Sequence, residues 1–306
     1  MATRARRIPR DWGLLWRMAF VMALLAGVYL AFITFLNAAG VPWLFIAIIA
    51  AIMLGLQFFL SDKMVLWSLG AKLIRAEEYP KLHAMVERLA MQAGLPMPKI
   101  AVINTDIPNA LATGRNPKNA VVAVTTGIMR RLDDEELEAV LGHELTHIKN
   151  RDVLVITLAS FFSMVASMLT NWLMWAMLLG GFGGRRDERG GGAWAIMLVW
   201  LVSWLVYIVS QLLILALSRY REYAADFGGA VLTGMPSRLA SALMKISSAI
   251  ARIPTEDLRK VEGANAFFIV SALKGDVLLE LLSTHPPVHK RVERLRRLEQ
   301  RMEWGR

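Results

Sequence analysis

The chain alternates between long apolar stretches and segments in which apolar and polar positions are mixed. Four apolar stretches stand out, at about residues 18–36, 41–60, 153–179 and 193–217. Each is close to or above the ~20 residues that cross the hydrocarbon core of a bilayer as a helix. They come in two pairs, so we expect two transmembrane hairpins in one multi-span helical membrane protein.

Basic residues flank the first hairpin. Lys63, Lys72 and Arg75 follow it. Four arginines precede it: Arg4, Arg6, Arg7 and Arg10. The positive-inside rule therefore predicts that both flanks lie in the cytoplasm. A cleaved signal peptide is the alternative for the first stretch, but its apolar run exceeds a usual signal core and a second span follows at once.

The second hairpin carries conflicting signals. Its connecting loop, GGFGGRRDERGGG, holds three arginines, so two full crossings would place these charges on the outer side, against the positive-inside rule. Its five tryptophans fit membrane interfaces but also fit a shallow hairpin. We expect two crossings, and the depth of this hairpin stays open.

The segment between the two pairs has the periodicity of a folded domain. Residues 77–92 predict an amphipathic helix, which AGLPMP ends. Three short runs rich in small and β-branched residues follow, KIAVI, NALATG and NAVVAVTT, and they predict a small sheet. Residues 132–150 then predict a helix, with Asp133 and Glu136 as a capping box at its start.

That last helix contains HELTH at residues 143–147. Positions four apart share one face of a helix, so the imidazoles of His143 and His147 can converge on one ion. A carboxylate beside such an ion, here Glu144, can take the proton of a water whose pKa the metal lowers. The pattern predicts a zinc-dependent hydrolase.

A catalytic zinc usually has three protein ligands, so a third is needed. Glu222 in SRYREYAADFGGA is the candidate, and Asp226, one turn further, could accept the free N–H of a ligand histidine. A surface glutamate, or pairing with Arg219 or Arg221, is the alternative. The apolar pair between HELTH and Glu222 must leave and return on one side of the membrane, which requires an even number of crossings.

Composition narrows the class of protein. Of the 306 residues, 56% are hydrophobic and 20% are charged, so parts of the chain lie in lipid and parts in water. The absence of cysteine excludes disulfides and thiolate ligands, which leaves histidines and carboxylates for a transition metal. The formal charge of +10 is explained by anionic lipid headgroups better than by nucleic acid, because no nucleic-acid-binding module is recognisable.

The motifs resemble one known family. They are PNALATGRNPKNAVVAVTTG (108–127), LDDEELEAVLGHELTHIKNRD (132–152), SRYREYAADFGGA (218–230) and STHPPVHKRVERL (283–295). Their order and the places of the apolar pairs resemble the HtpX-like branch of membrane zinc metallopeptidases, relatives of the CAAX prenyl proteases. The resemblance covers nearly the whole chain.

This resemblance implies an endopeptidase of the cytoplasmic (inner) membrane, with one Zn²⁺ per chain and an active site that faces the cytoplasm. Misfolded membrane proteins are the implied substrates, in a stress-response or quality-control role. The implied fold is mainly α, of the α+β type, with a gluzincin-like zinc protease domain that contains a small β-sheet. Glu222 is the implied third ligand, supported by Asp226.

Further residues take roles from the resemblance alone. Asn109 and Ala110 match the start of an edge strand thought to hold the substrate backbone, and a plain sheet edge is the alternative. His285 matches a histidine that stabilises the transition state, with a helix cap as the alternative. Arg291 matches an accompanying basic residue, which we group with the substrate-binding positions. His83 and His289 are expected to be structural and solvent-exposed, respectively.

The predicted organisation has four parts. A basic arm and hairpin (1–62) precede the first part of the protease domain (63–152), an inserted hairpin (153–217) follows, and the second part ends the chain (218–306). Three competing functions are CAAX-type processing, a silent zinc-binding adaptor and a metal transporter, but the spans lack the central ionisable residues of a transporter. Substrate identity, cleavage preference, oligomeric state and regulation leave no mark in the sequence.

Overall fold

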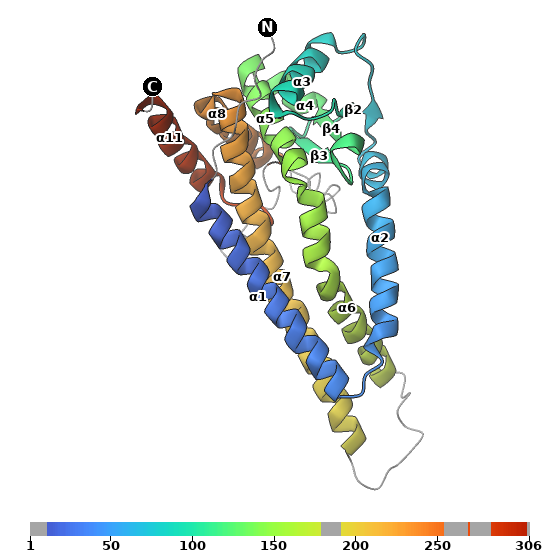
Figure 1. Cartoon of the computed structure of the whole chain (residues 1–306). Helices are drawn as coiled ribbons and strands as arrows, with labels where there is room; N and C mark the ends of the chain where they lie inside the picture. Colours follow the sequence, from blue (N-terminus) through green and yellow to red (C-terminus); the bar gives the residue numbers. More distant parts are fainter. Residues whose placement is uncertain (1–10, 179–190, 254–268, 270–282, 305–306) are drawn as a thin grey trace. The chain divides into compact units, whose positions relative to one another are not determined.

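The computed structural model describes residues 11–178, 191–253, 269 and 283–304 (Figure 1). The chain divides into two compact units. The first, here called the mixed unit, comprises Met1–Leu15, Phe59–Leu154 and Ser218–Arg306, and the second, the span unit, comprises Trp16–Phe58 and Val155–Leu217. The arginines before the first hairpin and those of the Gly-rich loop lie outside the described residues.

The mixed unit contains a four-stranded sheet with the strand order β1-β2-β4-β3. The strands are β1 (Lys72–Leu73), β2 (Lys99–Ile103), β3 (Ala110–Thr113) and β4 (Val121–Thr125). The central pair, β2 and β4, is parallel, and both outer pairs are antiparallel. The short 3-10 helix η1 (Pro117–Asn119) connects β3 to β4. At one end of the strand order, β3 is therefore an edge strand.

Both faces of this sheet are covered, which explains why its strands read as continuous apolar runs. Ile100 and Val102 of β2 belong to the main core, together with residues of the helices α3 and α5. Ala101 and Ile103 belong to a smaller cluster, against which the last residues of α2 (Trp43–Ser68) and the turn after it pack.

Helix α3 (Pro80–Ala93) is the amphipathic helix expected over residues 77–92. It begins later than expected because Pro80, which has no N–H to leave unpaired, occupies the first turn. It ends at Gly94, whose φ of +70° is in the left-handed region that favours glycine.

Helix α5 (Asp134–Asn150) begins with the predicted capping box. The Asp133 carboxylate accepts the N–H of Glu136 at 2.9 Å, and the Glu136 carboxylate accepts the N–H of Asp133 at 3.1 Å. Glu136 is buried and also accepts from Ser241 and Lys245 of α8 (Pro236–Ala251) at 2.7 Å each. The start of α5 is thereby fixed both locally and to a neighbouring helix.

Two further helices complete the mixed unit. They are α4 (Thr126–Arg131) and α11 (Val288–Trp304). The apolar residues Val292 and Leu295 of α11 join Leu239 and Leu243 of α8 in the main core. Helix α11 therefore buries one stripe, as its spacing of apolar positions predicts.

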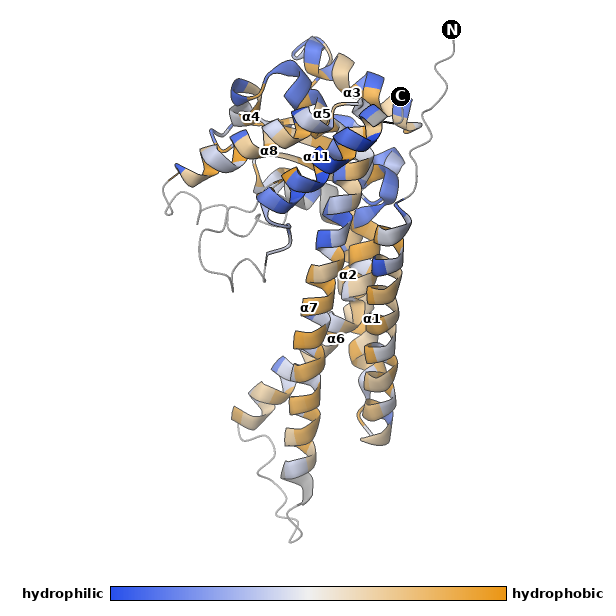
Figure 2. Ribbon diagram, turned by 90° about the vertical axis from the view of Figure 1, so that its left-hand side faces the viewer, coloured by the Kyte–Doolittle hydropathy of each residue, from blue (hydrophilic) through white to orange (hydrophobic). Residues whose placement is uncertain are grey.

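In the described part of the chain, four helices are long and apolar enough to cross a membrane, and the colouring of Figure 2 shows that their residues are predominantly hydrophobic. They are α1 (Trp12–Ala38), α2, α6 (Asp152–Leu178) and α7 (Gly191–Thr233). With 43 residues, α7 is about twice as long as a bilayer requires. Its apolar part ends at Leu217, and its continuation belongs to the mixed unit.

Inside the span unit, helices meet through small residues and a few polar contacts. Ala50 and Ala166 are fully buried in its core. The Tyr29 hydroxyl donates to the Ala159 carbonyl at 2.6 Å, and Gln211 Nε2 donates to Ser163 Oγ at 3.0 Å. Small residues allow close backbone approach and interhelical hydrogen bonds add to it, as is usual for helices packed in lipid.

The predicted fold class is confirmed: a mainly helical, multi-span protein with a small sheet. The elements that were not predicted from the sequence include β1, α4 and α8. The two residues of β1 are exposed and are in a strand only because they pair with Ala101 and Val102. No local pattern indicates such a strand.

Candidate metal centre

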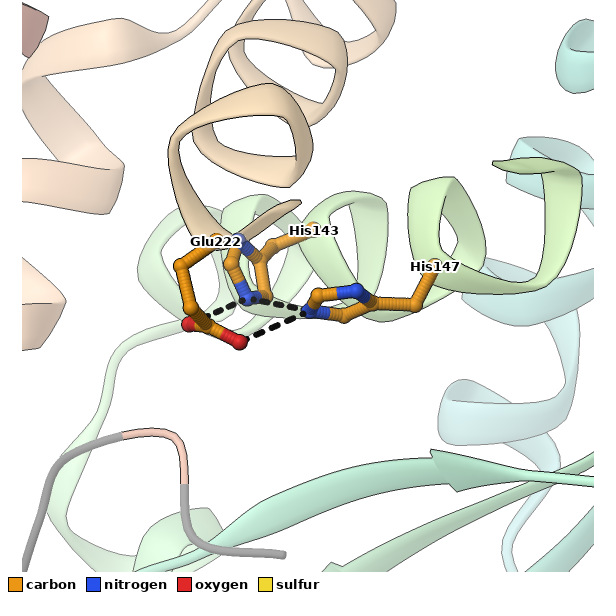
Figure 3. A group of neighbouring side chains, drawn as sticks. All are labelled: His143, His147 and Glu222. Carbon is orange, nitrogen blue, oxygen red and sulfur yellow. Dashed lines mark hydrogen bonds and ion pairs between the residues drawn. The ribbon is translucent and has the colours of Figure 1, made fainter. Parts of the chain in front are cut away.

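Helix α5 presents two histidines one turn apart on its face toward α7. Their Nε2 atoms lie 3.1 Å from each other, and both rings are buried or nearly so. Figure 3 shows the two imidazoles converging on one point. The HELTH spacing therefore produces the geometry expected of a ligand pair.

Glu222 reaches this point from α7 (Figure 3). Its Oε1 lies 3.4 Å from His147 Nε2, and its Oε2 lies 3.7 Å from His143 Nε2. Histidine and carboxylate atoms of His143, His147 and Glu222 all lie within 4.8 Å of one another. The structure thus brings together residues that are far apart in the sequence.

Close packing of glycines holds α7 against α5. A Cβ added to Gly229 would lie 2.6 Å from the His143 nitrogen and 2.8 Å from its Cα. One added to Gly142 would lie 2.7 Å from Thr233 Cγ2. At Gly229 the close atoms belong to the backbone of α5, so only hydrogen fits there and the two helix backbones touch beside the two histidines. This contact sets how far Glu222 lies from the imidazoles.

Each of the two histidines has a carboxylate at its other ring nitrogen. Asp226 Oδ1 lies 3.0 Å from His143 Nδ1, and Asp152 Oδ2 lies 2.6 Å from His147 Nδ1. Ionised carboxylates only accept hydrogen bonds, so each Nδ1 carries the proton and each Nε2 presents a lone pair.

The donor set fits a cation. Two lone pairs and a carboxylate face one another inside the protein, an arrangement that is repulsive unless a positive charge lies between them. Ligands held tetrahedrally about 2.0–2.1 Å from a zinc ion lie roughly 3.3–3.4 Å apart. The two imidazole nitrogens lie 3.1 Å apart, and the two oxygens of Glu222 lie 3.4 and 3.7 Å from one nitrogen each, which is close to that value.

Arg291 of α11 lies behind the ligands and is completely buried. Its guanidinium donates to both oxygens of Asp226, at 2.7 and 2.8 Å, and lies 3.4 Å from Glu222 Oε2. A further donation at 2.6 Å goes to the carbonyl of Ile269. Burial alone would lower the pKa of Arg291, but the adjacent carboxylates raise it above its ordinary value, so the side chain stays charged.

Glu144, adjacent to the first ligand, is buried with 3% of its surface exposed. Burial raises the pKa of its carboxyl, an effect that His143, His147 and Arg291 partly oppose. A raised pKa brings a carboxylate closer to neutral pH, where a general base is most effective. The environment of Glu144 therefore suits proton transfer.

The remaining histidines divide as follows. His285 is buried, and its Nδ1 lies 3.1 Å from Glu222 Oε2, so it belongs to the same cluster. His289 is exposed on α11, and His83 is half-buried on α3.

Asn109 and Ala110 lie at the start of the edge strand β3, which packs beside α5. Both are buried. Asn109 exchanges two hydrogen bonds of 2.9 Å with Thr125 of β4, through its own N–H and carbonyl. Its side-chain oxygen accepts the N–H of Ile269, also at 2.9 Å, so in this structure it binds the chain's own backbone.

Three features near the ligands were not predicted from the sequence. They are the carboxylate of Asp152, its buried partner Arg221 and the glycine contact between α5 and α7. Asp152 stands five positions after His147, and GG follows Asp226 by one residue. These spacings indicate a role only when the turn after α5 and the packing of α7 against α5 are known.

A family model described as peptidase family M48 matches residues 76–299. The chain is 58% identical over 299 residues to a protease HtpX homolog from Moorella thermoacetica, covering 97% of this chain and 98% of that protein. It is 53% identical over 297 residues to protease HtpX homolog 2 from Methanosarcina acetivorans, covering 97% and 99%.

The fold is similar to a crystal structure of Ste24p from S. mikatae, with a TM-score of 0.56 at 17% identity. That match covers 90% of this chain and 64% of the Ste24p chain. The family match, the relatives and the four apolar helices agree with one another. The chain belongs to peptidase family M48, and it is a membrane metalloprotease.

Proposed function

We propose that the chain is a zinc-dependent endopeptidase, with one Zn²⁺ held by His143, His147 and Glu222. One observation carries this proposal: two Nε2 lone pairs converge with a carboxylate, and each imidazole has an aspartate at its Nδ1. Three protein ligands leave one position for water, as in catalytic zinc sites, whereas structural sites are closed by four. A silent zinc-binding adaptor is therefore the weaker interpretation.

In this mechanism, bound zinc supplies a Lewis acid for the scissile carbonyl and lowers the pKa of water. Glu144 accepts the proton of the attacking water and passes it to the leaving amine. His285, whose Nδ1 lies at Glu222, donates from Nε2 as an imidazolium toward the oxygen on which negative charge develops, worth roughly 2.7–4 kcal/mol for a preorganised donor in other hydrolases. Arg291 and Asp226 hold Glu222 and His143 in place.

The edge strand β3, from Ala110, is the proposed binding place for the substrate. A peptide that adds to an edge strand is held by main-chain hydrogen bonds, which select little for side chains. Such binding suits a protease that degrades many misfolded membrane proteins. Asn109 supports this edge through its hydrogen bonds to Thr125.

We place the protein in the cytoplasmic membrane with the metal centre on the cytoplasmic side. Lys63, Lys72 and Arg75 follow the first hairpin in the mixed unit, where the positive-inside rule predicts cytoplasm. The hairpin that carries α6 and α7 then starts and ends on that same side.

The test compares wild type with Glu144→Gln in detergent, using an unfolded membrane protein as substrate. We expect the variant to keep one zinc per chain and to lose activity by about 10²–10⁴-fold, the usual contribution of a general base. A chelator should stop wild-type cleavage, and added zinc should restore it. Inverted membrane vesicles should cleave an added soluble peptide, and right-side-out vesicles should not.

Each part of the proposal has its own contrary result. Cleavage by Glu144→Gln at the wild-type rate would exclude this carboxylate as the base. Wild-type protein that binds zinc without cleaving any unfolded protein would favour the adaptor. Cleavage only by right-side-out vesicles would reverse the proposed orientation.

A further inference from the structure

Asp152, the first residue of α6, lies between the two helices that carry the metal ligands. Its Oδ2 accepts from His147 Nδ1 at 2.6 Å, and its Oδ1 forms an ion pair with Arg221 Nη2. Both charged side chains are largely buried, with 12% of Asp152 and 6% of Arg221 exposed. The Asp152–Arg221 ion pair is therefore buried and contacts His147, unlike an ordinary ion pair on the surface.

Arg221 directly precedes Glu222 in α7 and reaches back to α5. Its Nη2 also donates to the carbonyl of Asn150, the last residue of α5, at 3.1 Å. Arg221 therefore connects the ligand-bearing turn of α7 with the carboxyl end of the helix that carries both histidines.

The turn between α5 and α6 makes the arrangement possible. Arg151 has φ = +54°, the one positive value at a non-glycine position in the described part of the chain. Its N–H lies at the carbonyls of His147 and Ile148, which caps α5. This left-handed residue ends α5 and α6 begins at the next position, so that Asp152 lies beside His147 without an intervening loop.

We infer that Asp152 and Arg221 are positioning residues that act as one clamp: the buried ion pair fixes the ring of His147 relative to Glu222. The carboxylate at His143 Nδ1, Asp226, belongs to α7 itself, whereas the carboxylate at His147 Nδ1, Asp152, belongs to α6. The clamp connects Nδ1 of His147 to α7 through two side chains. This inference rests on the proposed zinc site.

Coupling follows from the burial of both charges. Removing either partner leaves the other without its counter-ion in a largely water-excluded place, so each single change disturbs the same contact. When two residues act through one contact, removing either residue abolishes the contribution of that contact. Removing the second residue as well should then cause no further loss. A double-mutant cycle therefore distinguishes a clamp from two independent supports.

The experiment measures zinc affinity of the full chain in detergent, by competition with a chromogenic chelator. The variants are Asp152→Asn, Arg221→Met and the double variant, which removes both charges and keeps the volumes similar. We expect each single variant to bind zinc roughly 10–100-fold more weakly, the usual effect of losing the partner of a ligand histidine. The double variant should be no weaker than the weaker single variant.

A second readout follows ligand geometry. Cobalt(II) substituted for zinc gives visible absorption bands that depend on the arrangement of its ligands. We expect these bands to shift in both single variants. Thermal unfolding of the metal-free proteins shows whether each variant folds. If a single variant does not fold, zinc affinity and the cobalt spectrum are measured on the double variant, which leaves no unpaired buried charge.

The matched control is another arginine–carboxylate pair, formed between α3 and α5. Arg88 Nη2 of α3 lies 2.5 Å from Glu138 Oε2 of α5, and both side chains are partly exposed. The double variant Arg88→Met with Glu138→Gln removes one positive and one negative charge, as the double variant of the clamp does. It should leave zinc affinity and the cobalt spectrum unchanged.

Wild-type protein that does not bind zinc would refute the proposed function itself. If wild type binds zinc and Asp152→Asn binds it within about threefold, the clamp does not exist. If both single variants are weaker and their losses multiply in the double variant, Asp152 and Arg221 act separately and the inference is equally wrong.

Discussion

The two ligand-bearing helices differ in what holds them. Helix α5 carries two of the proposed ligands in one turn, and its own sequence supplies its capping box and its apolar stripe. Helix α7 carries one ligand beyond a long apolar span, and contacts with other elements hold that ligand in place. Gly229 touches α5, and Arg291 of α11 binds Asp226.

The difference shows which substitutions should weaken metal binding most. Ligands on one helix keep their spacing as long as the helix forms, because four residues fix it. A ligand on a second helix depends on the distance and rotation between the helices. We therefore expect changes on the α7 side to alter metal binding more than changes at the start of α5.

The largest effect is expected from Arg291→Met. The substitution leaves Asp226 and Glu222 buried without their arginine, which costs about 3–5 kcal/mol for a broken buried pair. Thermal unfolding of the metal-free protein should show a much lower midpoint than wild type. Chelator competition should show weaker zinc binding, because Asp226 no longer holds His143 as firmly.

Arg294→Met is the control for that substitution. Arg294 lies three positions further on α11, with its guanidinium 4.2 Å from the ring centre of Tyr223, and its side chain is 37% exposed. Its loss should cost below about 1 kcal/mol. Equal effects of the two substitutions would show that the buried ion pairs of Arg291 do not support the site.

A smaller loss is expected from Gly229→Ala. The added methyl group would overlap the backbone of His143, so α7 must move away from α5, at a cost of about 1–3 kcal/mol. Glu222 should move with α7 while the histidine pair keeps its spacing. Zinc affinity should therefore fall by more than the change in stability alone would predict.

Gly55→Ala provides the comparison, because nothing lies within 4 Å of a Cβ at this helical position of α2. Alanine there should be neutral or should stabilise by up to about 1 kcal/mol. Unchanged zinc affinity in Gly229→Ala would mean that the close contact does not set the position of Glu222.

The same contrast explains what could be predicted from the sequence. The HELTH pair, the capping box and the four spans each depend on spacing within one segment, so their patterns are local. Glu222 could be named as a candidate because a third ligand was required and because the chain resembled a family. Its alternatives remained open until the structure placed it beside both imidazoles.

Features that depend on tertiary contacts could not be predicted. Arg291 was grouped with substrate-binding positions, but its guanidinium contacts two carboxylates and a carbonyl of its own chain. Asp152 had no pattern to mark it, since its role depends on the left-handed turn at Arg151. Buried polar pairs form between distant elements, and hydrophobic periodicity says nothing about them.

The smallest effect is expected from Asp133→Ala at the start of α5. The alanine cannot accept the N–H of Glu136, and losing such a cap costs about 1 kcal/mol, within a usual range of 0.5–2. Asp133→Asn keeps an acceptor and should lose less. Both are measured as small shifts in the midpoint of thermal unfolding.

Zinc affinity should not change in Asp133→Ala, and this is the sharper half of the prediction. His143 lies about 15 Å along the helix from the cap, at 1.5 Å per residue. Fraying of the first turn is opposed by Glu136, which stays bound to Ser241 and Lys245 of α8. If zinc binding weakened as much as in Gly229→Ala, the ligand pair of α5 would not be locally determined, and the contrast between the two helices would fail.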